Sequence, residues 1–313
     1  MDKNQKQNKF DVIIIGSGPS GYTAGIYTAR AGYKTLIISG ILKGGQLMNT
    51  TEVENYPGFP EGILGPDLMN NMLQQCKNMG TVLISDEVSS VDFKQYPFLI
   101  KISENKYYSR SVIICTGATP RKLGIQSENF FSAKGVSYCA TCDGPFFKNL
   151  ELAVIGGGDS AMEEAIFLTK FASKVHIIHR RQKLRASNIM QNRAMTNDKI
   201  VFHLDTKVEE ILGDHKVKSL ILKNTITNKN KKLNVGGVFI AIGHVPNTSL
   251  FKDNIDLDNN GYIILKNKSE TSVRGIFAAG DVHDHSYRQA ITAAGFGCMA
   301  AIDVDKFLTR IDK

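Results

Sequence analysis

The sequence has no apolar run that approaches the ~20 residues that a helix needs to span a bilayer. Its first residues, MDKNQKQNKF, are polar and lysine-rich and lack the apolar centre of a secretory signal. Cysteine is scarce and scattered, since only Cys139 and Cys142 of the five cysteines are close together. An odd, dispersed set of this kind argues against a secreted disulfide framework. These absences predict a cytoplasmic protein that has no membrane partner.

The basic residues lack the clustering that is typical of a nucleic-acid-binding surface. The chain has 313 residues, with 38 Lys and Arg against 30 Asp and Glu, for a net charge of +8. Because this charge is spread out, no nucleic-acid partner is expected. A solvated surface and an attraction to an acidic partner or anionic cofactors both stay open. The one dense run, Lys229–Lys232, lies between strand-like segments at Lys218–Leu222 and Val235–Ile242 and is predicted to form a hairpin tip.

A strand–turn–helix–strand pattern occurs twice in the chain. The length and the hydrophobic content of 42% suit about two globular domains. The pattern is the first half of a dinucleotide-binding βαβ unit, so two copies predict two nucleotide sites in an α/β fold with two Rossmann-like domains. The first copy is expected at Phe10–Ile15, a helix up to about Ala31, and Lys34–Ser39; the second is expected at Leu152–Ile155, Ser160–Ala172 and Lys174–His179.

A glycine-rich turn follows the first strand of each copy. The turns GSGPSG (16–21) and GGGDSA (156–161) both fit the motif G-x-G-x-x-G/A. The first glycine forms the tight turn, the second lets the backbone approach a pyrophosphate, and the third small residue lets helix and strand pack closely. The N–H groups at the start of the helix then favour phosphate binding. The residues expected to bind cofactors are Gly16, Gly18 and Gly21 in the first turn and Gly156, Gly158 and Ala161 in the second.

The two copies differ at the position that distinguishes NAD from NADP. About 20 residues after the glycines, an acidic residue usually binds the ribose 2′-hydroxyl, whereas arginine accommodates a 2′-phosphate. The second copy ends in His179-Arg180-Arg181, with Arg185 shortly after. Guanidinium groups bind a phosphate dianion through paired hydrogen bonds, so NADPH is the predicted nucleotide. The first copy ends in Ile38-Ser39-Gly40, and no acidic ribose ligand is assigned there.

Near the C-terminus, the apolar stretch Gly275–Gly280 delivers Asp281 at the carboxyl end of a short strand. Ligands of α/β folds bind at such strand ends. A helix is expected to begin near Arg288-Gln289-Ala290. This combination resembles flavoproteins in which the aspartate holds the ribityl chain and the helix N-terminus faces the pyrimidine edge of the flavin. The resemblance implies that the first nucleotide is FAD and that Asp281 binds it.

The segment C-A-T-C-D-G, Cys139–Gly144, lies between the two nucleotide motifs. A C-x-x-C pair can close a small, reducible disulfide, and pairing lowers the pKa of one thiol so that its thiolate can attack another disulfide. Asp143 beside the pair is placed to relay a proton. The alternative is half of a zinc site, but there is no second C-x-x-C or nearby histidine pair, so no metal is expected. The remaining cysteines are expected to pack as small hydrophobic side chains: Cys76, Cys115 and Cys298.

In order and spacing, these motifs resemble those of the low-molecular-weight thioredoxin reductases, a class of pyridine nucleotide-disulfide oxidoreductases. The resemblance covers nearly the whole chain, and C-A-T-C-D-G is its most specific element. The segments that carry it are Gly16–Gly21, Lys43–Leu47, Glu52–Gly58, Thr116–Ala118, Cys139–Gly144, His179–Arg185, Ala241–Asn247 and Gly275–Asp281.

The resemblance implies a homodimeric enzyme that passes electrons from NADPH through FAD to oxidised thioredoxin, its protein partner. In such an enzyme, Cys142 receives electrons from the flavin, Cys139 attacks the disulfide of the partner, and Asp143 is the acid/base. The resemblance also implies Gln46, Asn55 and Gln289 at FAD and Lys134 near thioredoxin, and it agrees with Arg180, Arg181 and Arg185 at the 2′-phosphate. For Phe146 and Phe147, an apolar contact with thioredoxin and a place in the core both stay open.

The domain layout that follows has an FAD domain in two parts, residues 1–119 and 248–313. The NADPH domain, residues 120–247, is inserted between them and carries the cysteine pair. The two connections, Thr116–Arg121 and Gly243–Asn247, contain Gly and Pro and suit hinges. Because the NADPH motif and the cysteine pair share one domain, each turnover is expected to need two orientations of that domain.

Three other functions compete with this interpretation. A flavin-dependent ferredoxin reductase would use the same nucleotides but lack the C-x-x-C pair. A reductase of a peroxidase would carry an extra N-terminal thioredoxin-like module, for which a first strand at Phe10 is expected to leave no room. A non-enzymatic redox sensor would bind both nucleotides without steady turnover of NADPH.

Overall fold

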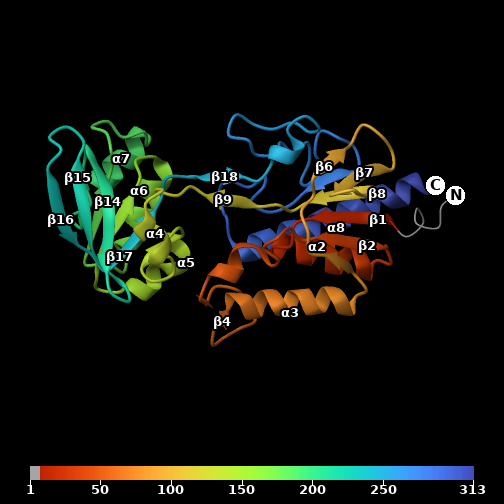
Figure 1. Cartoon of the computed structure of the whole chain (residues 1–313), viewed down its shortest axis with the longest axis horizontal. Helices are drawn as coiled ribbons and strands as arrows, with labels where there is room; N and C mark the ends of the chain where they lie inside the picture. The colour runs from red at the N-terminus through yellow and green to blue at the C-terminus, as the bar shows by residue number, and fades with distance from the viewer. Residues whose placement is uncertain (1–7) are drawn as a thin grey trace. The chain divides into compact units, whose positions relative to one another are not determined.

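The computed structural model describes residues 8–313, and the chain divides into two compact units (Figure 1). Unit 1 comprises Met1–Thr119 and Val245–Lys313, and unit 2, Pro120–His244, is inserted between these parts. Residues 1–7, on which the interpretation of a non-secretory N-terminus rests, lie outside the described residues. Unit 2 ends at His244 rather than at Asn247, because Asn247 donates hydrogen bonds to the carbonyl oxygens of Thr116 and Gly117 in unit 1.

The sheet of unit 1 is built around a strand that is apolar on both faces. Strand β1 (Lys9–Ile15) lies between β2 (Thr35–Ile38) and β8 (Asn105–Ile114) and is parallel to both. Its side chains from Val12 to Ile14 are 0% exposed, as expected for a parallel strand that is covered on both sides. The other strands are β5 (Val82–Ile84), which pairs with β2; β19 (Ile276–Ala278), which pairs with β8; and the antiparallel β7 (Phe98–Ile102) and β6 (Ser90–Asp92).

Three longer helices belong to unit 1, namely α2 (Pro19–Arg30), α3 (Gly65–Asn78) and α8 (Ala290–Ile311). Helix α2 begins at the first glycine turn, and proline at its first position suits a helix start. Small residues let α2 and α8 pack closely, since a Cβ atom on Gly297 of α8 would collide with the backbone of Ser20. The short elements are 3-10 turns at Gly45–Asn49 and Ser249–Phe251, β3 (Glu52–Val53), β4 (Ile63–Leu64), and the paired crossing strands β9 (Ala118–Pro120) and β18 (His244–Pro246).

Unit 2 consists of a parallel sheet and a smaller antiparallel sheet. The parallel sheet has the order β10 (Val136–Ser137), β17 (Gly237–Ile240), β11 (Glu151–Ile155), β12 (Lys174–Ile178) and β13 (Ile200–His203). One apolar core packs between this sheet and α6 (Asp159–Leu168) and α7 (Asn188–Met195), and a second packs between the two sheets. The remaining elements are β14 (Thr206–Gly213), β15 (Val217–Asn224), β16 (Asn230–Asn234), α4 (Gln126–Phe130), α5 (Ala140–Asp143) and a 3-10 turn at Gly144–Phe147.

The α/β class with two Rossmann-like parallel sheets is confirmed, but the expected hairpin around Lys229–Lys232 is wrong in detail. Its second strand is β16, which pairs antiparallel with β15, whereas β17 belongs to the parallel sheet. The turn therefore lies between Asn224 and Asn230, where the Asn224 side chain accepts hydrogen bonds from the N–H groups of Ile226 and Thr227. Lys231 and Lys232 lie on this edge strand, where charge hinders pairing with other chains, and Lys229 lies in the turn.

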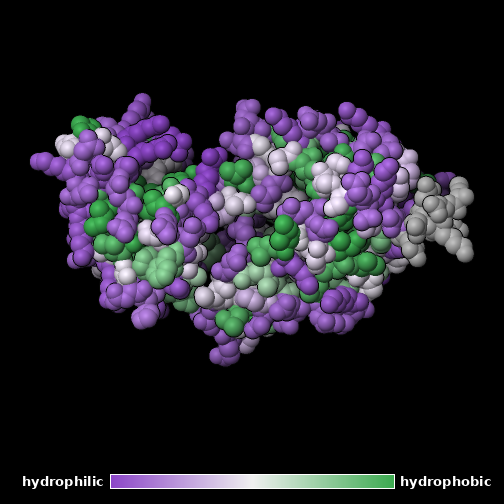
Figure 2. All heavy atoms as spheres, viewed as in Figure 1, coloured by the Kyte–Doolittle hydropathy of each residue, from purple (hydrophilic) through white to green (hydrophobic). Residues whose placement is uncertain are grey.

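Figure 2 shows hydrophilic residues over most of the visible face, broken by small hydrophobic patches. None of the helices within residues 8–313 combines the length and the apolar composition required to cross a membrane.

Candidate active site

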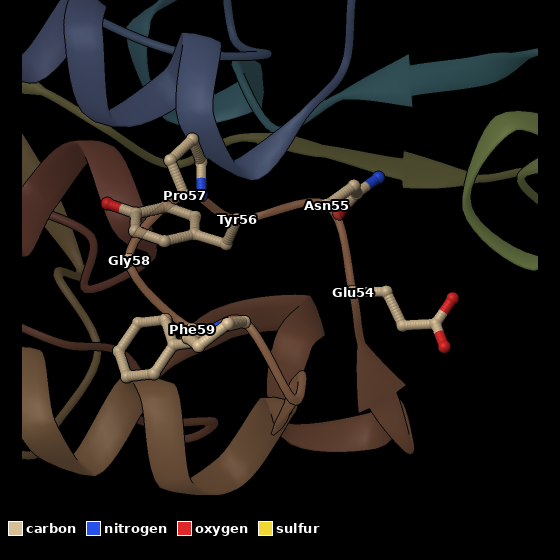
Figure 3. A pocket seen from close by; sticks show the side chains of 7 residues that line it. Glu54, Asn55, Tyr56, Pro57, Gly58 and Phe59 are labelled. Atoms are coloured by element: carbon tan, nitrogen blue, oxygen red, sulfur yellow. The ribbon is translucent and has the colours of Figure 1, made fainter.

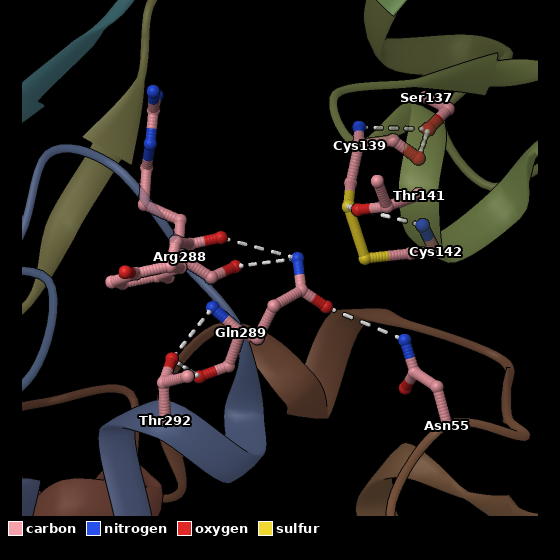
Figure 4. Close-up of a disulfide and its surroundings, with 9 residues drawn as sticks. Asn55, Ser137, Cys139, Thr141, Cys142, Arg288, Gln289 and Thr292 are labelled. Atoms are coloured by element: carbon pink, nitrogen blue, oxygen red, sulfur yellow. Dashed lines mark hydrogen bonds between the residues drawn. A yellow bond between two sulfur atoms is a disulfide. The ribbon is translucent and has the colours of Figure 1, made fainter. Parts of the chain in front are cut away.

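Cys139 and Cys142 form a disulfide in unit 2 (Figure 4). Cys139 is the N-cap of the short helix α5, and its sulfur accepts a hydrogen bond from the N–H of Cys142 at 3.2 Å. The hydroxyl oxygen of Ser137 accepts a hydrogen bond from the N–H of Cys139 at 3.0 Å, which fixes the segment before the helix. Within the described part of the chain, no group of three or more His, Cys, Asp or Glu could hold a metal ion. The pair is therefore a disulfide here, with a donor already directed at one of its sulfurs.

Asp143 is the last residue of α5 and is half-buried. Burial raises the pKa of its carboxyl, and a hydrogen bond from Ser137 opposes this effect. A carboxyl with a raised pKa exchanges protons closer to neutral pH than an exposed aspartate does. Its position next to Cys142 and its environment both suit the acid/base role expected for it.

The other cysteines have environments that differ from that of the pair. Cys76 and Cys115 are buried in an apolar cluster of unit 1, which confirms that they pack as small hydrophobic side chains. Burial raises the pKa of each thiol to about 12, so that neither provides a thiolate at neutral pH. Cys298 is half-buried on α8 and lies outside that cluster.

The first glycine turn leaves open space where a cofactor is expected. A Cβ atom on Gly16 would collide with the carbonyl of Cys115, and one on Gly21 would collide with the carbonyl of Gly16, whereas one on Gly18 would meet nothing within 4 Å. No side chain caps the first N–H groups of α2. Gly16 and Gly21 thus allow close backbone packing, and Gly18 borders free space in front of an uncapped helix.

Asn55 and Gln289 come from distant segments, and unit 1 brings them together. The amide of Asn55 donates to the side-chain oxygen of Gln289 at 3.3 Å (Figure 4). Gln289 is the N-cap of α8 and forms a capping box with Thr292. The loop that holds Asn55, Glu54–Pro60, lines a pocket of about 400 Å³, with Tyr56 and Phe59 on the same side of the loop (Figure 3).

Asp281 and Gln46 complete the group expected at FAD. Asp281 lies just beyond the end of β19, after Ala279 and Gly280, and is half-buried. Burial, assisted by the charge of Asp284, raises the pKa of Asp281 to about 6, while Arg288 opposes the shift. Gln46 lies in the turn Gly45–Asn49, is exposed, and donates a hydrogen bond to the carbonyl of Ala118.

The second glycine turn repeats the geometry of the first in unit 2. A Cβ atom on Gly156 would collide with the carbonyl of Ala241 and the side chain of Ala161, whereas one on Gly158 would meet nothing within 4 Å. Ala161 is buried against the sheet, and no side chain caps the start of α6. Gly158 therefore borders free space in front of α6, as Gly18 does in front of α2.

Arg180, Arg181 and Arg185 are exposed and lie on the loop that follows β12. The backbone brings this loop to the second glycine turn, because the N–H of Arg185 donates to the carbonyl of Gly157 at 2.6 Å. The three guanidinium groups and the open space beside Gly158 thus belong to neighbouring loops of the same unit.

The residues expected near a protein partner divide into exposed and packed side chains. Phe146 is 45% exposed, whereas Phe147 is half-buried and packs on Phe239, with 5.3 Å between the two ring centroids. The structure therefore places Phe147 with the core and leaves Phe146 accessible. Lys134 is exposed, and its ammonium group lies 4.9 Å from the ring centroid of Phe130, which is exposed as well.

Sequence patterns alone miss a pair that links the two loops of unit 2. Asp159, the first residue of α6, accepts hydrogen bonds from both the N–H and the hydroxyl of Ser187, each at 2.8 Å. The one available signal is a carboxylate inside a turn that is expected to bind phosphate. Nothing in the sequence indicates which distant residue holds it.

Comparisons with known proteins identify the family. The model of the pyridine nucleotide-disulphide oxidoreductases matches residues 10–297. The thioredoxin reductase of Rickettsia conorii is 53% identical over 96% of this chain and 98% of its own length, and that of Mycolicibacterium smegmatis is 49% identical over 98% and 99%. The solved thioredoxin reductase from Giardia duodenalis has a TM-score of 0.93 at 42% identity and covers 97% of this chain and 100% of that one. The chain therefore belongs to the pyridine nucleotide-disulphide oxidoreductases and, within them, to the thioredoxin reductases.

Proposed function

We propose that this chain reduces oxidised thioredoxin, using NADPH as electron source, FAD as carrier and the Cys139–Cys142 pair as the exchanging disulfide. The observation that carries the proposal is this disulfide in the segment C-A-T-C-D-G of a chain that is 53% identical to a thioredoxin reductase. The flavin, when bound, accepts a hydride from the nicotinamide and returns two electrons to the disulfide. The proposed partner is thioredoxin, and the family resemblance favours a homodimer.

FAD fits unit 1. Gly18 leaves room for the pyrophosphate, and the first N–H groups of α2 have no side-chain cap. Asp281, half-buried at the end of β19, can accept hydrogen bonds from ribityl hydroxyl groups. We assign Gly16, Gly18, Gly21, Gln46, Asn55, Asp281 and Gln289 to this site.

NADPH fits unit 2. Gly158 leaves room for the pyrophosphate at the uncapped start of α6. The neighbouring loop presents three exposed guanidinium groups, whose planar, fixed donors match the oxygens of a phosphate. We assign Gly156, Gly158, Ala161, Arg180, Arg181 and Arg185 to this site.

The cysteine pair carries out two successive exchanges. After reduction, the Cys139 thiolate attacks one sulfur of the thioredoxin disulfide, forming a mixed disulfide and releasing the other thioredoxin sulfur as a thiolate. The hydrogen bond from the N–H of Cys142 stabilises negative charge on the Cys139 sulfur. Asp143 then takes the proton of the Cys142 thiol, and Cys142 attacks Cys139 to restore the internal disulfide and release reduced thioredoxin.

The proposal is tested on the purified protein. We expect a yellow flavin spectrum and oxidation of NADPH that depends on added thioredoxin and exceeds the rate with a generic aromatic disulfide. The absence of flavin, or a rate indifferent to thioredoxin, would overturn the proposal. Steady turnover would also exclude a redox sensor that only binds the nucleotides.

Two glycines of the first turn are expected to respond differently to alanine. Gly21→Ala places a Cβ atom against the carbonyl of Gly16, and overpacking of this kind costs ~1–3 kcal/mol of unfolding free energy. Gly18→Ala meets open space and should cost at most about 1 kcal/mol as a poorer helix cap. The added methyl group should nevertheless fill the room for the pyrophosphate. Thermal unfolding of the FAD-free variants and flavin retention measure the two effects.

The two variants separate cofactor binding from the packing of the fold. Gly18→Ala should fold like the unaltered protein but lose FAD on dilution, whereas Gly21→Ala should unfold at lower temperature even without the cofactor. Full retention of FAD in a folded Gly18→Ala variant would show that the open space beside Gly18 is not the pyrophosphate site.

A further inference from the structure

Unit 2 links its glycine turn to its arginine loop, here residues 180–186, through side chains that carry no assigned role. Both the N–H and the hydroxyl of Ser187 donate to one carboxylate oxygen of Asp159, each at 2.8 Å. Asp159 is the first residue of α6, and Ser187 is the N-cap of α7, where its hydroxyl oxygen accepts the N–H of Met190 at 3.4 Å. The end of the arginine loop is thereby attached to the first turn of α6.

Gly157 forms the second link between the same two segments. Its carbonyl accepts the N–H of Arg185 at 2.6 Å and that of Ala186 at 3.0 Å. The ring of His179 also packs against Gly157, where an added Cβ atom would collide with it. His179 is buried, and its Nε2 lies 3.2 Å from the carbonyl oxygen of Lys183 within the loop. The arginine loop is thus attached to the glycine turn by its backbone and by Asp159.

The charge of Asp159 makes its contribution distinctive. Hydrogen bonds from the backbone and hydroxyl of Ser187 lower the pKa of its carboxyl, so it is ionised at neutral pH. An ionised carboxylate in the first turn of α6 repels the anionic pyrophosphate proposed to bind there. Any benefit to cofactor binding must therefore come from what the carboxylate holds in place rather than from its charge.

We propose that Asp159 and Ser187 are positioning residues that hold the arginine loop at the spacing at which its guanidinium groups meet the 2′-phosphate of a nucleotide seated on the glycine turn. This inference rests on the proposed NADPH site. A nucleotide without the 2′-phosphate needs only the glycine turn. Asp159 and Ser187 therefore increase selectivity for NADPH over NADH without contacting either nucleotide. The adenosine end of the cofactor is the part that it affects.

The test uses the flavin-containing protein and calorimetric titration with 2′,5′-ADP, which carries the 2′-phosphate but no nicotinamide. Asp159→Ala should weaken binding roughly three- to tenfold, which is less than the loss of a whole charge-assisted hydrogen bond, because the guanidinium groups are shifted rather than removed. Asp159→Asn keeps an oxygen that accepts from Ser187 and should restore the affinity. Ser187→Ala, which keeps its N–H, should lie between them. In turnover, Asp159→Ala should raise the KM for NADPH and leave the KM for NADH unchanged.

Each other outcome points to a definite error. Equal losses for NADPH and NADH, or an Asp159→Asn variant as weak as Asp159→Ala, would show that Asp159 supports α6 in general and would overturn the inference. So would an unchanged affinity for 2′,5′-ADP in Asp159→Ala. Arg180→Gln in the same titration separates the two levels: if it leaves 2′,5′-ADP binding intact, the NADPH site itself is misassigned. If it weakens binding while Asp159→Ala does not, only the positioning role fails.

Discussion

Replacing either Cys139 or Cys142 by serine is expected to abolish thioredoxin reduction. The exchange needs both sulfurs, because Cys139 forms the mixed disulfide and Cys142 resolves it. A serine hydroxyl can do neither, so the rate should fall at least ~10³-fold, as when any member of a catalytic unit is removed. Neither cysteine belongs to a nucleotide motif, and each lies in unit 2, so both variants should retain FAD and its reduction by NADPH. Stopped-flow absorbance of the flavin and a thioredoxin assay measure the two functions separately.

Cys298→Ser is the matched control for these variants. It makes the same chemical change at a half-buried position on α8 in unit 1, outside the apolar cluster that holds Cys76 and Cys115. Thioredoxin reduction should be unaffected in it. Loss of FAD from Cys139→Ser or Cys142→Ser would assign the pair a structural role in place of an exchanging one.

The elements next to the glycine turns could be predicted from the sequence because their signals are local. A continuous apolar run, a glycine turn and a helical run follow one another before β2 and again before β12. Strands β1 and β11 begin within one residue of the expected positions Phe10 and Leu152. Helix α6 ends at Leu168 rather than at Ala172, since the chain turns after Thr169 and the N–H of Asn149 bonds to the carbonyl of Phe171. Helix ends depend on such distant partners.

Strand pairing could not be predicted in the same way. The sequence predicts a hairpin tip at Lys229–Lys232 and one strand at Val235–Ile242, but this part of the chain contributes one strand to the antiparallel sheet and one to the parallel sheet. The Asn224 side chain fixes the turn between Asn224 and Asn230, and only the folded chain shows where β15 ends. A sequence pattern indicates that strands exist but not which of two sheets each one joins.

The candidate site divides along the same line. The disulfide and the two glycine turns are motifs of residues contiguous in the sequence. Asn55 and Gln289, in contrast, are 234 residues apart in the sequence and could be paired only by family resemblance. Sequence alone could not predict which of Phe146 and Phe147 is buried, because the two residues are identical neighbours. Phe146 is exposed, whereas Phe147 packs on Phe239. Asp159 and Ser187 belong to no motif, and only the structure brings them together.

Replacing Arg180 and Arg181 together by glutamine is expected to remove most of the preference for NADPH. Each charge-assisted hydrogen bond to a phosphate contributes ~1.5–3 kcal/mol, which corresponds to about 10–100-fold in apparent affinity. Both guanidinium groups are exposed on the loop after β12, so their loss leaves no buried donor unsatisfied and should not destabilise unit 2. The KM for NADPH should rise by at least that factor, because two guanidinium groups are lost, while the KM and kcat for NADH stay nearly unchanged.

The control has to separate a specific contact from a change in overall charge. Arg193→Gln removes a positive charge from the exposed side of α7 in the same unit and should leave both KM values as they are. Raising the salt concentration should weaken NADPH binding to the unaltered protein more than to the double variant, because screening acts on the ionic contacts that the double variant has lost. If NADPH and NADH suffered equally in the double variant, the arginines would support the loop rather than bind the 2′-phosphate, and the nucleotide preference would have to come from another part of unit 2.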